Sequence, residues 1–297
     1  MRIKYLLIVF ITVWCNVILA QDSKVDETVT QWESWDEVWL LNDDAQGNFQ
    51  IEAYKPIFLT FTNYNNGINN IPTSENPINF NDISLGFTDQ ELKFQLSFKT
   101  RVWNNVFNSS VDLWAAYTQS SRWQIFNGAI SRPFRETNYE PEIMAIIPTD
   151  YSLFGLKGTH IGVSFNHQSN GRANPFSRSW NRIIFEAGLE VKNLSVLIRP
   201  WIRLSEDAIE DDNPEILNYL GRGELVVDYH FGKFSWYSIV RHSLRFGDNS
   251  RGGFQSDLHW HVNSNLAFKL HTFHGYGESL LDYNYKVSMV GLGVLLN

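Results

Sequence analysis

The chain has 297 residues, of which 43% are hydrophobic and 19% are charged, so it can bury a large core and is not a low-complexity disordered chain. Its 24 basic and 32 acidic residues give a net charge of −8, which excludes the basic surface that nucleic-acid binding needs and leaves nucleic acid out of the expected partners. A single cysteine excludes an internal disulfide and a cysteine zinc site.

The start of the chain has the pattern of an export signal. Two basic residues precede an uncharged stretch over residues 5–20, and a polar region follows. This pattern predicts a signal peptide over residues 1–20, cut after Ala20, although Ile18 is larger than the small residue usual at that position. An N-terminal anchor helix is the alternative, but the stretch is shorter than the roughly 20 residues that span a bilayer.

An acidic segment over residues 21–55 follows the signal and precedes the first predicted strand. Its acidic residues are Asp22, Asp26, Glu27, Glu33, Asp36, Glu37, Asp43, Asp44 and Glu52. The sequence leaves open whether this segment packs against the rest of the protein or stays outside it.

Beyond the acidic segment, apolar and polar residues alternate with a period of two. Residues 92–99 are an example, with leucine or phenylalanine at even positions and a polar residue at odd positions. This alternation is typical of β-strands with one apolar face. Twelve such segments are predicted, over residues 56–64, 91–103, 110–120, 141–150, 158–169, 179–191, 194–204, 216–231, 234–245, 253–262, 266–275 and 285–296. Because no apolar stretch of about 20 residues follows the signal, no transmembrane helix is expected.

The connections between these segments alternate between short turns and longer loops, which is typical of an outer-membrane β-barrel. Hydrocarbon cannot satisfy a free strand edge, so a sheet that spans a membrane must close. We therefore predict an all-β protein, a twelve-stranded antiparallel transmembrane β-barrel over residues 56–297. A soluble β-sandwich or soluble barrel is the alternative, and it does not explain the long strands or the 21 Phe, 12 Tyr and 11 Trp.

Three polar residues fall on the predicted lipid-facing side, next to one loop. His167 and Ser169 end segment 158–169 in phase with its apolar row, and Asn181 is in phase with the apolar row of segment 179–191. The loop over residues 170–178 joins the two segments, so the three side chains can converge.

This trio has the residue types of a serine hydrolase. Residues two apart on a strand share a face, so the His167 imidazole can take the proton of the Ser169 hydroxyl. Asn181 can accept a hydrogen bond from the other ring nitrogen, and an uncharged orienter suits a lipid-facing wall, where an unpaired carboxylate is costly. Polar residues at the barrel rim are the alternative interpretation, since placement there costs only about 0–1 kcal/mol.

Other polar residues are weaker candidates. Gln119 ends the apolar row of segment 110–120, which favours a contact with a partner subunit, with rim placement as the alternative. Four histidines suggest a metal, but we interpret the first three as part of a polar interior because of their phase; they are His259, His261, His271 and His274. Four acidic residues form a loop that we interpret as solvated rather than cation-binding, namely Asp207, Glu210, Asp211 and Asp212.

Several segments closely resemble the outer membrane phospholipase A family. They are His167-Gln168-Ser169-Asn170-Gly171-Arg172, Ser177-Arg178-Ser179-Trp180-Asn181-Arg182, Pro133-Phe134-Arg135-Glu136-Thr137-Asn138-Tyr139-Glu140-Pro141, Tyr117-Thr118-Gln119 and Gly275-Tyr276-Gly277-Glu278-Ser279-Leu280-Leu281-Asp282-Tyr283-Asn284. The matches spread over residues 114–284, while the first strands and the N-terminal segment match more loosely. The family's fold is a twelve-stranded antiparallel barrel, in agreement with the strand count above.

The resemblance also implies an activity. It identifies Ser169 as the nucleophile, His167 as the general base and Asn181 as its orienter, in an enzyme that hydrolyses sn-1 and sn-2 acyl esters of phospholipids and lysophospholipids, with phospholipase A1 and A2 activities. The expected localisation is the bacterial outer membrane, with the active site toward the outer leaflet and membrane phospholipids as partners. A catalytically silent narrow channel or adhesin barrel is the alternative, and a soluble secreted esterase is a second one.

The same resemblance implies a calcium-dependent homodimer. The Ca²⁺ ligands would be the Ser177 side chain, the Arg172 carbonyl and the Ser131 hydroxyl of the other subunit. The Gly171 backbone N–H and a calcium-bound water would form the oxyanion hole, and Gln119 would hydrogen-bond across the dimer interface.

Overall fold

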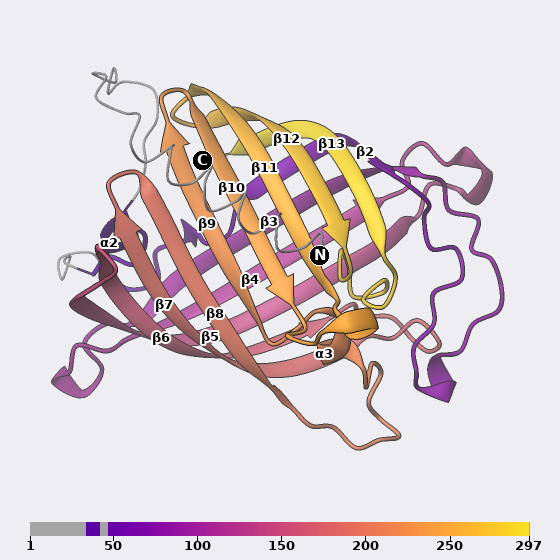
Figure 1. The fold of residues 1–297 in the computed structure, drawn as a ribbon, viewed down its shortest axis with the longest axis horizontal. Coiled ribbons are helices and arrows are strands. Elements are labelled where there is room, and N and C mark those ends of the chain that lie inside the picture. Colours follow the sequence, from indigo (N-terminus) through magenta and orange to yellow (C-terminus); the bar gives the residue numbers. More distant parts are fainter. Residues whose placement is uncertain (1–33, 42–46, 297) are drawn as a thin grey trace.

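Twelve antiparallel strands close into a barrel in the computed structural model (Figure 1), which describes residues 34–41 and 47–296. The predicted signal peptide and residues 21–33 lie outside the described residues. The barrel strands are β2 (Ile57–Asn65), β3 (Gln90–Trp103), β4 (Asp112–Trp123), β5 (Phe134–Leu153), β6 (Leu156–Ser169), β7 (Ser179–Val191), β8 (Leu194–Leu204), β9 (Gly223–Phe231), β10 (Phe234–His242), β11 (Gly252–Asn263), β12 (Leu266–Gly275) and β13 (Val287–Leu296).

The barrel is built from neighbouring strands only. Each strand pairs with the next one in the chain, and β13 pairs with β2 from Met289↔Asn65 to Leu296↔Ile57, which closes the sheet. A two-residue strand, β1 (Glu52–Ala53), pairs with β3. The predicted twelve-stranded antiparallel barrel is thus confirmed. No helix in the described part of the chain is long and apolar enough to cross a membrane.

Two strands begin seven residues away from their predicted starts, and the others begin within two residues of theirs. β5 begins at Phe134, whereas the predicted segment began at residue 141. The apolar rhythm is missing there because Thr137 takes an outward position, yet its backbone still pairs with Ser121 of β4. β9 begins at Gly223, whereas the prediction began at residue 216.

A short helix, α3 (Ile216–Tyr219), occupies the residues predicted to start β9. Its first residue and Leu220 are buried with Trp180 and Trp201 in an apolar cluster inside the long-loop end of the barrel. Burying these side chains favours the helical turn over an extended strand, which would project alternate residues outward. Other short helical turns lie in the loops, η1 (Pro77–Asn79), η2 (Val106–Asn108), η3 (Gly128–Ile130) and η4 (Gly247–Asn249).

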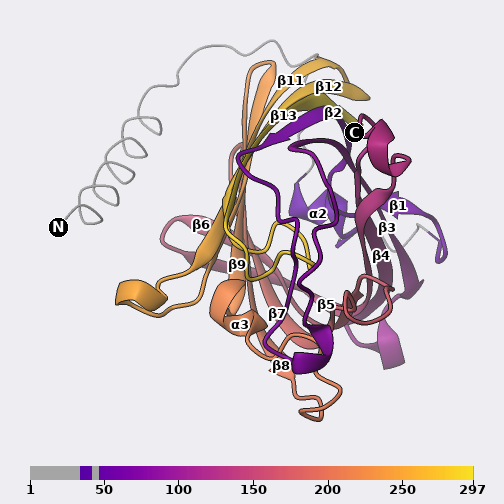
Figure 2. The same ribbon diagram turned by 90° about the vertical axis from the view of Figure 1, so that its right-hand side faces the viewer.

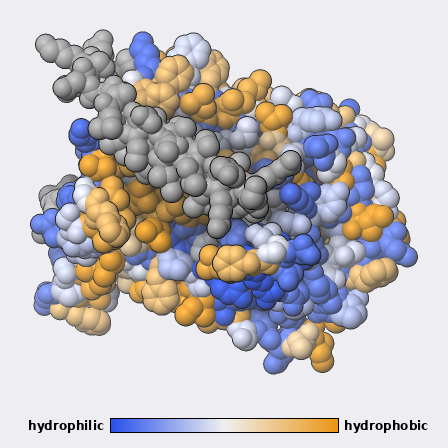
Figure 3. Space-filling view, in the orientation of Figure 1, coloured by the Kyte–Doolittle hydropathy of each residue, from blue (hydrophilic) through white to orange (hydrophobic). Residues whose placement is uncertain are grey.

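The two faces of the wall differ in polarity. Apolar side chains such as Ile161, Val163 and Phe165 are exposed on the outside, and Figure 3 shows apolar residues gathered over the strands. Charged side chains point inward and form ion pairs, for example Arg199 with Glu142 at 2.7 Å. Buried charges require such partners. The predicted inward phase of three histidines is confirmed, since all are buried: His259, His261 and His271.

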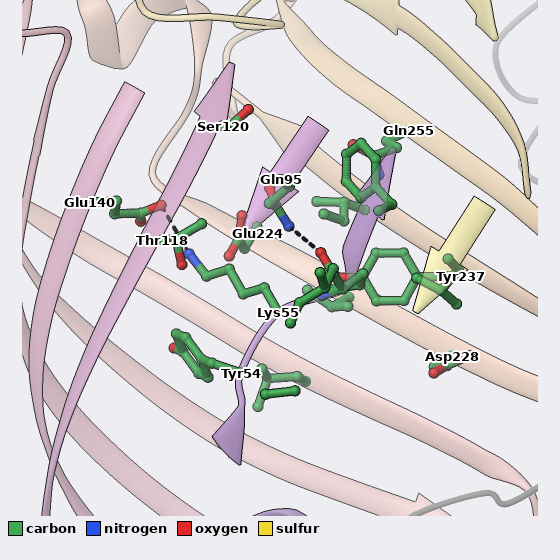
Figure 4. Close-up of a pocket in the computed structure, with 18 of the residues that line it drawn as sticks. Tyr54, Lys55, Gln95, Thr118, Ser120, Glu140, Glu224, Asp228, Tyr237 and Gln255 are labelled. Carbon is green, nitrogen blue, oxygen red and sulfur yellow. Dashed lines mark hydrogen bonds and ion pairs between the residues drawn. The ribbon is translucent and has the colours of Figure 1, made fainter. Parts of the chain in front are cut away.

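A polar cavity of about 850 Å³ lies inside the barrel (Figure 4). The chain before β2 runs along it, and Lys55 forms an ion pair with Glu140 at 3.0 Å. Gln95 donates a hydrogen bond to the Pro56 carbonyl at 2.9 Å. Polar contacts in the interior therefore hold the segment that precedes β2.

Part of the acidic segment packs within the barrel. Helix α2 (Trp35–Val38) lies at the same end as the β7–β8 turn (Figure 1), and its capping box joins Ser34 and Glu37. Trp39 is buried against Trp114, with the Lys99 ammonium 4.4 Å from its ring centre. The question that the sequence left open is thus answered for these residues.

The long loops gather at the opposite end, which faces the viewer in Figure 2. Residues 66–89 cross this end and bond to two other loops. Asn79 donates to the Asp212 carbonyl at 3.0 Å, and Asn284 donates to the Thr73 carbonyl at 3.1 Å. The predicted catalytic trio lies at this long-loop end.

Candidate active site

The ends of β6 and β7 position the predicted catalytic residues. In the register of this pair, His167 lies opposite Asn181 and Ser169 lies opposite Ser179. Phe165, two residues before His167, is 45% exposed on the outer wall, whereas the intervening Asn166 is fully buried. Because strand side chains alternate, His167 and Ser169 also face outward. The trio therefore shares the outer face of the barrel.

A hydrogen bond joins two of the three residues. His167 Nδ1 lies 2.8 Å from Asn181 Oδ1. Since an amide oxygen only accepts, this bond assigns the proton to Nδ1 and leaves Nε2 as an acceptor. This tautomer is the one that a general base needs, with Asn181 in the orienting role.

The Ser169 hydroxyl lies on the same face, next to this pair. Within the described part of the chain, the structure has no hydrogen bond between Ser169 and His167. Such bonds are often long without substrate and tighten when it binds. The arrangement thus has the residues of a nucleophile and base, and one of its two hydrogen bonds is formed.

The inward-facing neighbours hold both strands in place. Trp180 donates from Nε1 to Gln168 Oε1 at 2.8 Å, so an interior pair sits directly beside the exterior His167–Asn181 pair. Trp180 is fully buried and packs edge-on against Trp201, with 6.0 Å between the ring centres. Truncating a tryptophan in such a core typically costs about 3–5 kcal/mol, so this packing holds the ends of β6 and β7 in place.

The loop over residues 170–178 is tied to itself by Asn170. The backbone N–H of Asn170 donates to the Arg178 carbonyl, and the Arg178 N–H donates to Asn170 Oδ1, both at 3.0 Å. Gly171 has a φ of +64°, and a Cβ there would lie 3.1 Å from the Tyr139 ring. A glycine is therefore needed at the position after Asn170.

The predicted calcium ligands lie in two loops. The Ser177 hydroxyl donates to Asp212 Oδ2 at 2.6 Å, and Arg172 donates from Nη1 to the Arg135 carbonyl at 3.1 Å. Ser131 is exposed in another loop, directly after η3, with a φ of +63°. A serine hydroxyl beside a carboxylate offers the hard oxygen donors that Ca²⁺ prefers, so this part of the site fits the ion. Among the described residues, no group of three or more His, Cys, Asp or Glu is placed to hold a metal.

Part of the acidic loop contradicts the interpretation from the sequence. Asp207 and Glu210 are exposed, as a solvated loop requires. Asp211, however, forms an ion pair with Arg203 at 2.5 Å, and Asp212 accepts a hydrogen bond from Ser177. The interpretation was wrong for these two because the loop folds back onto β7 and β8.

One residue of this loop that the sequence analysis missed contacts the trio directly. Glu206 Oε1 accepts a hydrogen bond from Asn181 Nδ2 at 3.1 Å. A signal was present, because the two-residue connection between segments 179–191 and 194–204 places Leu204 opposite Asn181. The residues just after Leu204 must therefore start beside the orienter.

Gln119 lies at the level of Ser169, two strands away. It pairs in register with Tyr139, which pairs in turn with Ser169. The Gln119 amide already has partners in the chain, since Tyr117 donates to its oxygen at 3.2 Å and its nitrogen donates to Ser121 at 3.4 Å. Its predicted contact with a partner subunit stays a prediction.

Comparisons with known proteins identify similar sequences and a similar fold. The phospholipase A1 family model matches residues 35–296. A phospholipase A1 of Escherichia coli K12 is 38% identical over 70% of this chain and 70% of its own, and one of Salmonella typhimurium is 36% identical over 84% and 82%. A crystal structure of the Salmonella typhi outer membrane phospholipase dimer with bound calcium superposes with a TM-score of 0.75 and 33% identity, over 87% of this chain and 95% of that one.

Proposed function

The chain belongs to the phospholipase A1 family, and from this premise we propose that it cleaves phospholipid acyl esters by a calcium-dependent Ser-His-Asn mechanism as a dimer. It is a β-barrel of the bacterial outer membrane and a lipid ester hydrolase. The proposed catalytic residues are Ser169, His167 and Asn181, the proposed ion is Ca²⁺ and the proposed active form is a dimer. The proposed substrates are the sn-1 and sn-2 esters of phospholipids and of lysophospholipids.

Ser169, His167 and Asn181 would carry the acyl transfer. The Ser169 oxygen attacks the ester carbonyl while His167 Nε2 takes its proton, and Asn181 holds the imidazole through Nδ1. When the tetrahedral intermediate collapses, the bond to the glycerol oxygen breaks and His167 returns the proton to that oxygen. Water then attacks the acyl-enzyme by the same route and releases a fatty acid.

The oxyanion would be stabilised from the loop after Ser169. The backbone N–H of Gly171 donates to the carbonyl oxygen as negative charge develops on it. Ser177, the Arg172 carbonyl and Ser131 of the partner subunit would hold Ca²⁺, which supplies positive charge near this oxygen. The oxygen donors around Ser177 support this part of the proposal.

The dimer would control the activity. One ligand comes from the partner, so a monomer has an incomplete site. Gln119 would hydrogen-bond across the interface, at the level of Ser169. An intact outer leaflet holds little phospholipid, and we infer that the enzyme rests as a monomer and becomes active when phospholipid reaches that leaflet.

The observation that carries the proposal is the 2.8 Å hydrogen bond between His167 and Asn181 on the lipid-facing wall, with Ser169 on the same face. The test is a calcium titration of phospholipid hydrolysis by the purified protein, with Ser169→Ala measured in parallel. We expect chelation to silence the wild type and Ser169→Ala to be inactive but still a heat-modifiable barrel. Wild-type turnover in that variant would reject the assignment of the nucleophile, and a chelator-resistant rate would reject the role of calcium.

A further inference from the structure

We propose that Glu206 is a positioning residue of the active site, which fixes the orientation of the Asn181 amide and places a negative charge behind it. The inference rests on the proposed function, since it concerns the group that orients the general base. It adds a fourth member to the relay, from Ser169 through His167 and Asn181 to Glu206.

The hydrogen bonds of Asn181 carry the argument. Its Oδ1 accepts from His167 at 2.8 Å, and its Nδ2 donates to Glu206 at 3.1 Å. An asparagine can exchange its oxygen and nitrogen by a flip of the amide. A carboxylate only accepts, so with Glu206 in place only the unflipped amide satisfies both neighbours. That orientation also presents an acceptor to His167, as the basic tautomer requires.

The surroundings of Glu206 leave it available for this bond. Its side chain is 20% exposed and lies 3.7 Å from Arg203, but Arg203 has a closer partner in Asp211 at 2.5 Å. Asp212 is a further acidic neighbour. Burial raises the pKa of Glu206, Arg203 and the hydrogen bond from Asn181 act to lower it, and the two aspartates raise it, with a net rise above the usual value.

The position of Glu206 supplies a negative charge near His167 without a carboxylate at the position of Asn181. A carboxylate on the lipid-facing wall would be costly, and asparagine avoids that cost but brings no charge to stabilise an imidazolium. Glu206 follows the end of β8, in a rim loop that reaches water. The negative charge of Glu206 is therefore separated from His167 by the side chain of Asn181. It acts on the imidazole through the polarised amide of Asn181.

The first experiment compares Glu206→Gln with Glu210→Gln in hydrolysis of dispersed phospholipid at saturating calcium. Glutamine keeps the shape but can also donate, so it allows the flipped amide and removes the charge. We expect kcat to fall about tenfold with an unchanged KM, the size expected for loss of a hydrogen bond to a charged group. Glu210 is exposed in the same loop, and its variant should match the wild type.

The pH profile separates positioning from a structural role. Without the negative charge an imidazolium at His167 is less stable, so the acidic limb of the kcat profile should move to lower pH by about half a unit. A loss of folded protein would lower the amplitude and leave the limb in place. Heat-modifiability measures the folded fraction of each variant.

A charge exchange provides a second test. Asn181→Asp places a second carboxylate next to that of Glu206. The two like charges repel, so this variant should be less active than the wild type. Adding Glu206→Gln gives the new carboxylate a donor, so the double variant should recover at least tenfold over Asn181→Asp. Wild-type kinetics in Glu206→Gln, or no recovery in the double variant, would overturn the inference while an active wild type and an inactive Ser169→Ala would leave the proposed function intact.

Discussion

At the scale of single residues, the hydrogen bonds of the candidate site fix the orientation of the His167 ring and of the Asn181 amide. His167 is hydrogen-bonded to Asn181 through Nδ1, which leaves Nε2 as the acceptor nitrogen. Asn181 carries no charge, so its contribution is geometric and should be smaller than that of a buried aspartate. We therefore expect Asn181 to raise the rate without being indispensable.

Asn181→Ala tests this expectation. The variant removes the acceptor for Nδ1 but leaves Ser169 and Gly171 in place. A hydrogen bond of this kind is worth about 1–3 kcal/mol, so kcat should fall about 5-fold to 150-fold. The measurement is kcat at saturating substrate, with Ser169→Ala as the floor. An unchanged rate would show that another group orients His167, and a rate at the floor would show that the orienter is as essential as the nucleophile.

At the scale of elements, the strands could be predicted because their pattern is set by the two environments of the wall. Hydrocarbon outside and paired charges inside make residues alternate, so β6, β7 and β8 match their predicted bounds to within two residues. The same alternation predicted that the proposed catalytic residues share the outer face, since His167 and Ser169 interrupt an apolar row. The family motif then supplied the chemistry.

The loops could not be predicted in this way, because contacts between distant segments determine them. The short connection after β7 places the residues after Leu204 beside Asn181, but it does not indicate that Asp212, further along the same loop, folds back onto Ser177. The insertion of Trp39 into the barrel also depends on a distant partner, Trp114. Periodicity reports the local environment of a strand and contains no information on such partners.

Glu278 anchors the loop after β12 by ion pairs with buried cations. It is therefore a suitable residue for measuring how buried charges stabilise the long-loop end of the barrel. Glu278 contacts Arg122 at 3.0 Å, Lys93 at 2.8 Å and Arg135 at 3.5 Å. Burial alone would raise its pKa, but Arg122, Lys93 and Arg135 more than offset this and hold the pKa well below its usual value. A lowered folded-state pKa stabilises the protein above the unfolded value of about 4.3, and this stability is lost as the pH falls through the lower folded value.

Glu278→Gln should therefore lower the free energy of unfolding by about 3 kcal/mol at pH 7, because it leaves buried cations without their anion. The difference from the wild type should persist down to about pH 5 and shrink only below about pH 4. Urea unfolding of the detergent-solubilised protein across this range measures it, with the exposed Glu210→Gln as the control. A variant as stable as the wild type at pH 7 would contradict this account of the anchor.

At the scale of the whole molecule, the proposed chemistry depends on the difference in polarity between the two faces of the barrel. The interior holds paired charges and part of the N-terminal segment, and the proposed catalytic residues lie on the wall that touches lipid. A second copy is the partner that the proposed calcium site requires. Because a twofold dimer has two equivalent sites, each subunit would give Ser131 to its partner and receive Ser131 in return.

Mixing two inactive variants tests whether the site is shared. Ser131→Ala keeps its own Ser169, and Ser169→Ala keeps a Ser131 to donate, so a mixed dimer would contain one complete site. Random pairing of equal amounts makes half of the dimers mixed, and activity should recover to about a quarter of the wild-type value. The matched control mixes Ser177→Ala with Ser169→Ala, where each variant damages its own subunit's site and no complete site can form. Recovery in both mixtures, or in neither, would mean that Ser131 does not act in the partner's site.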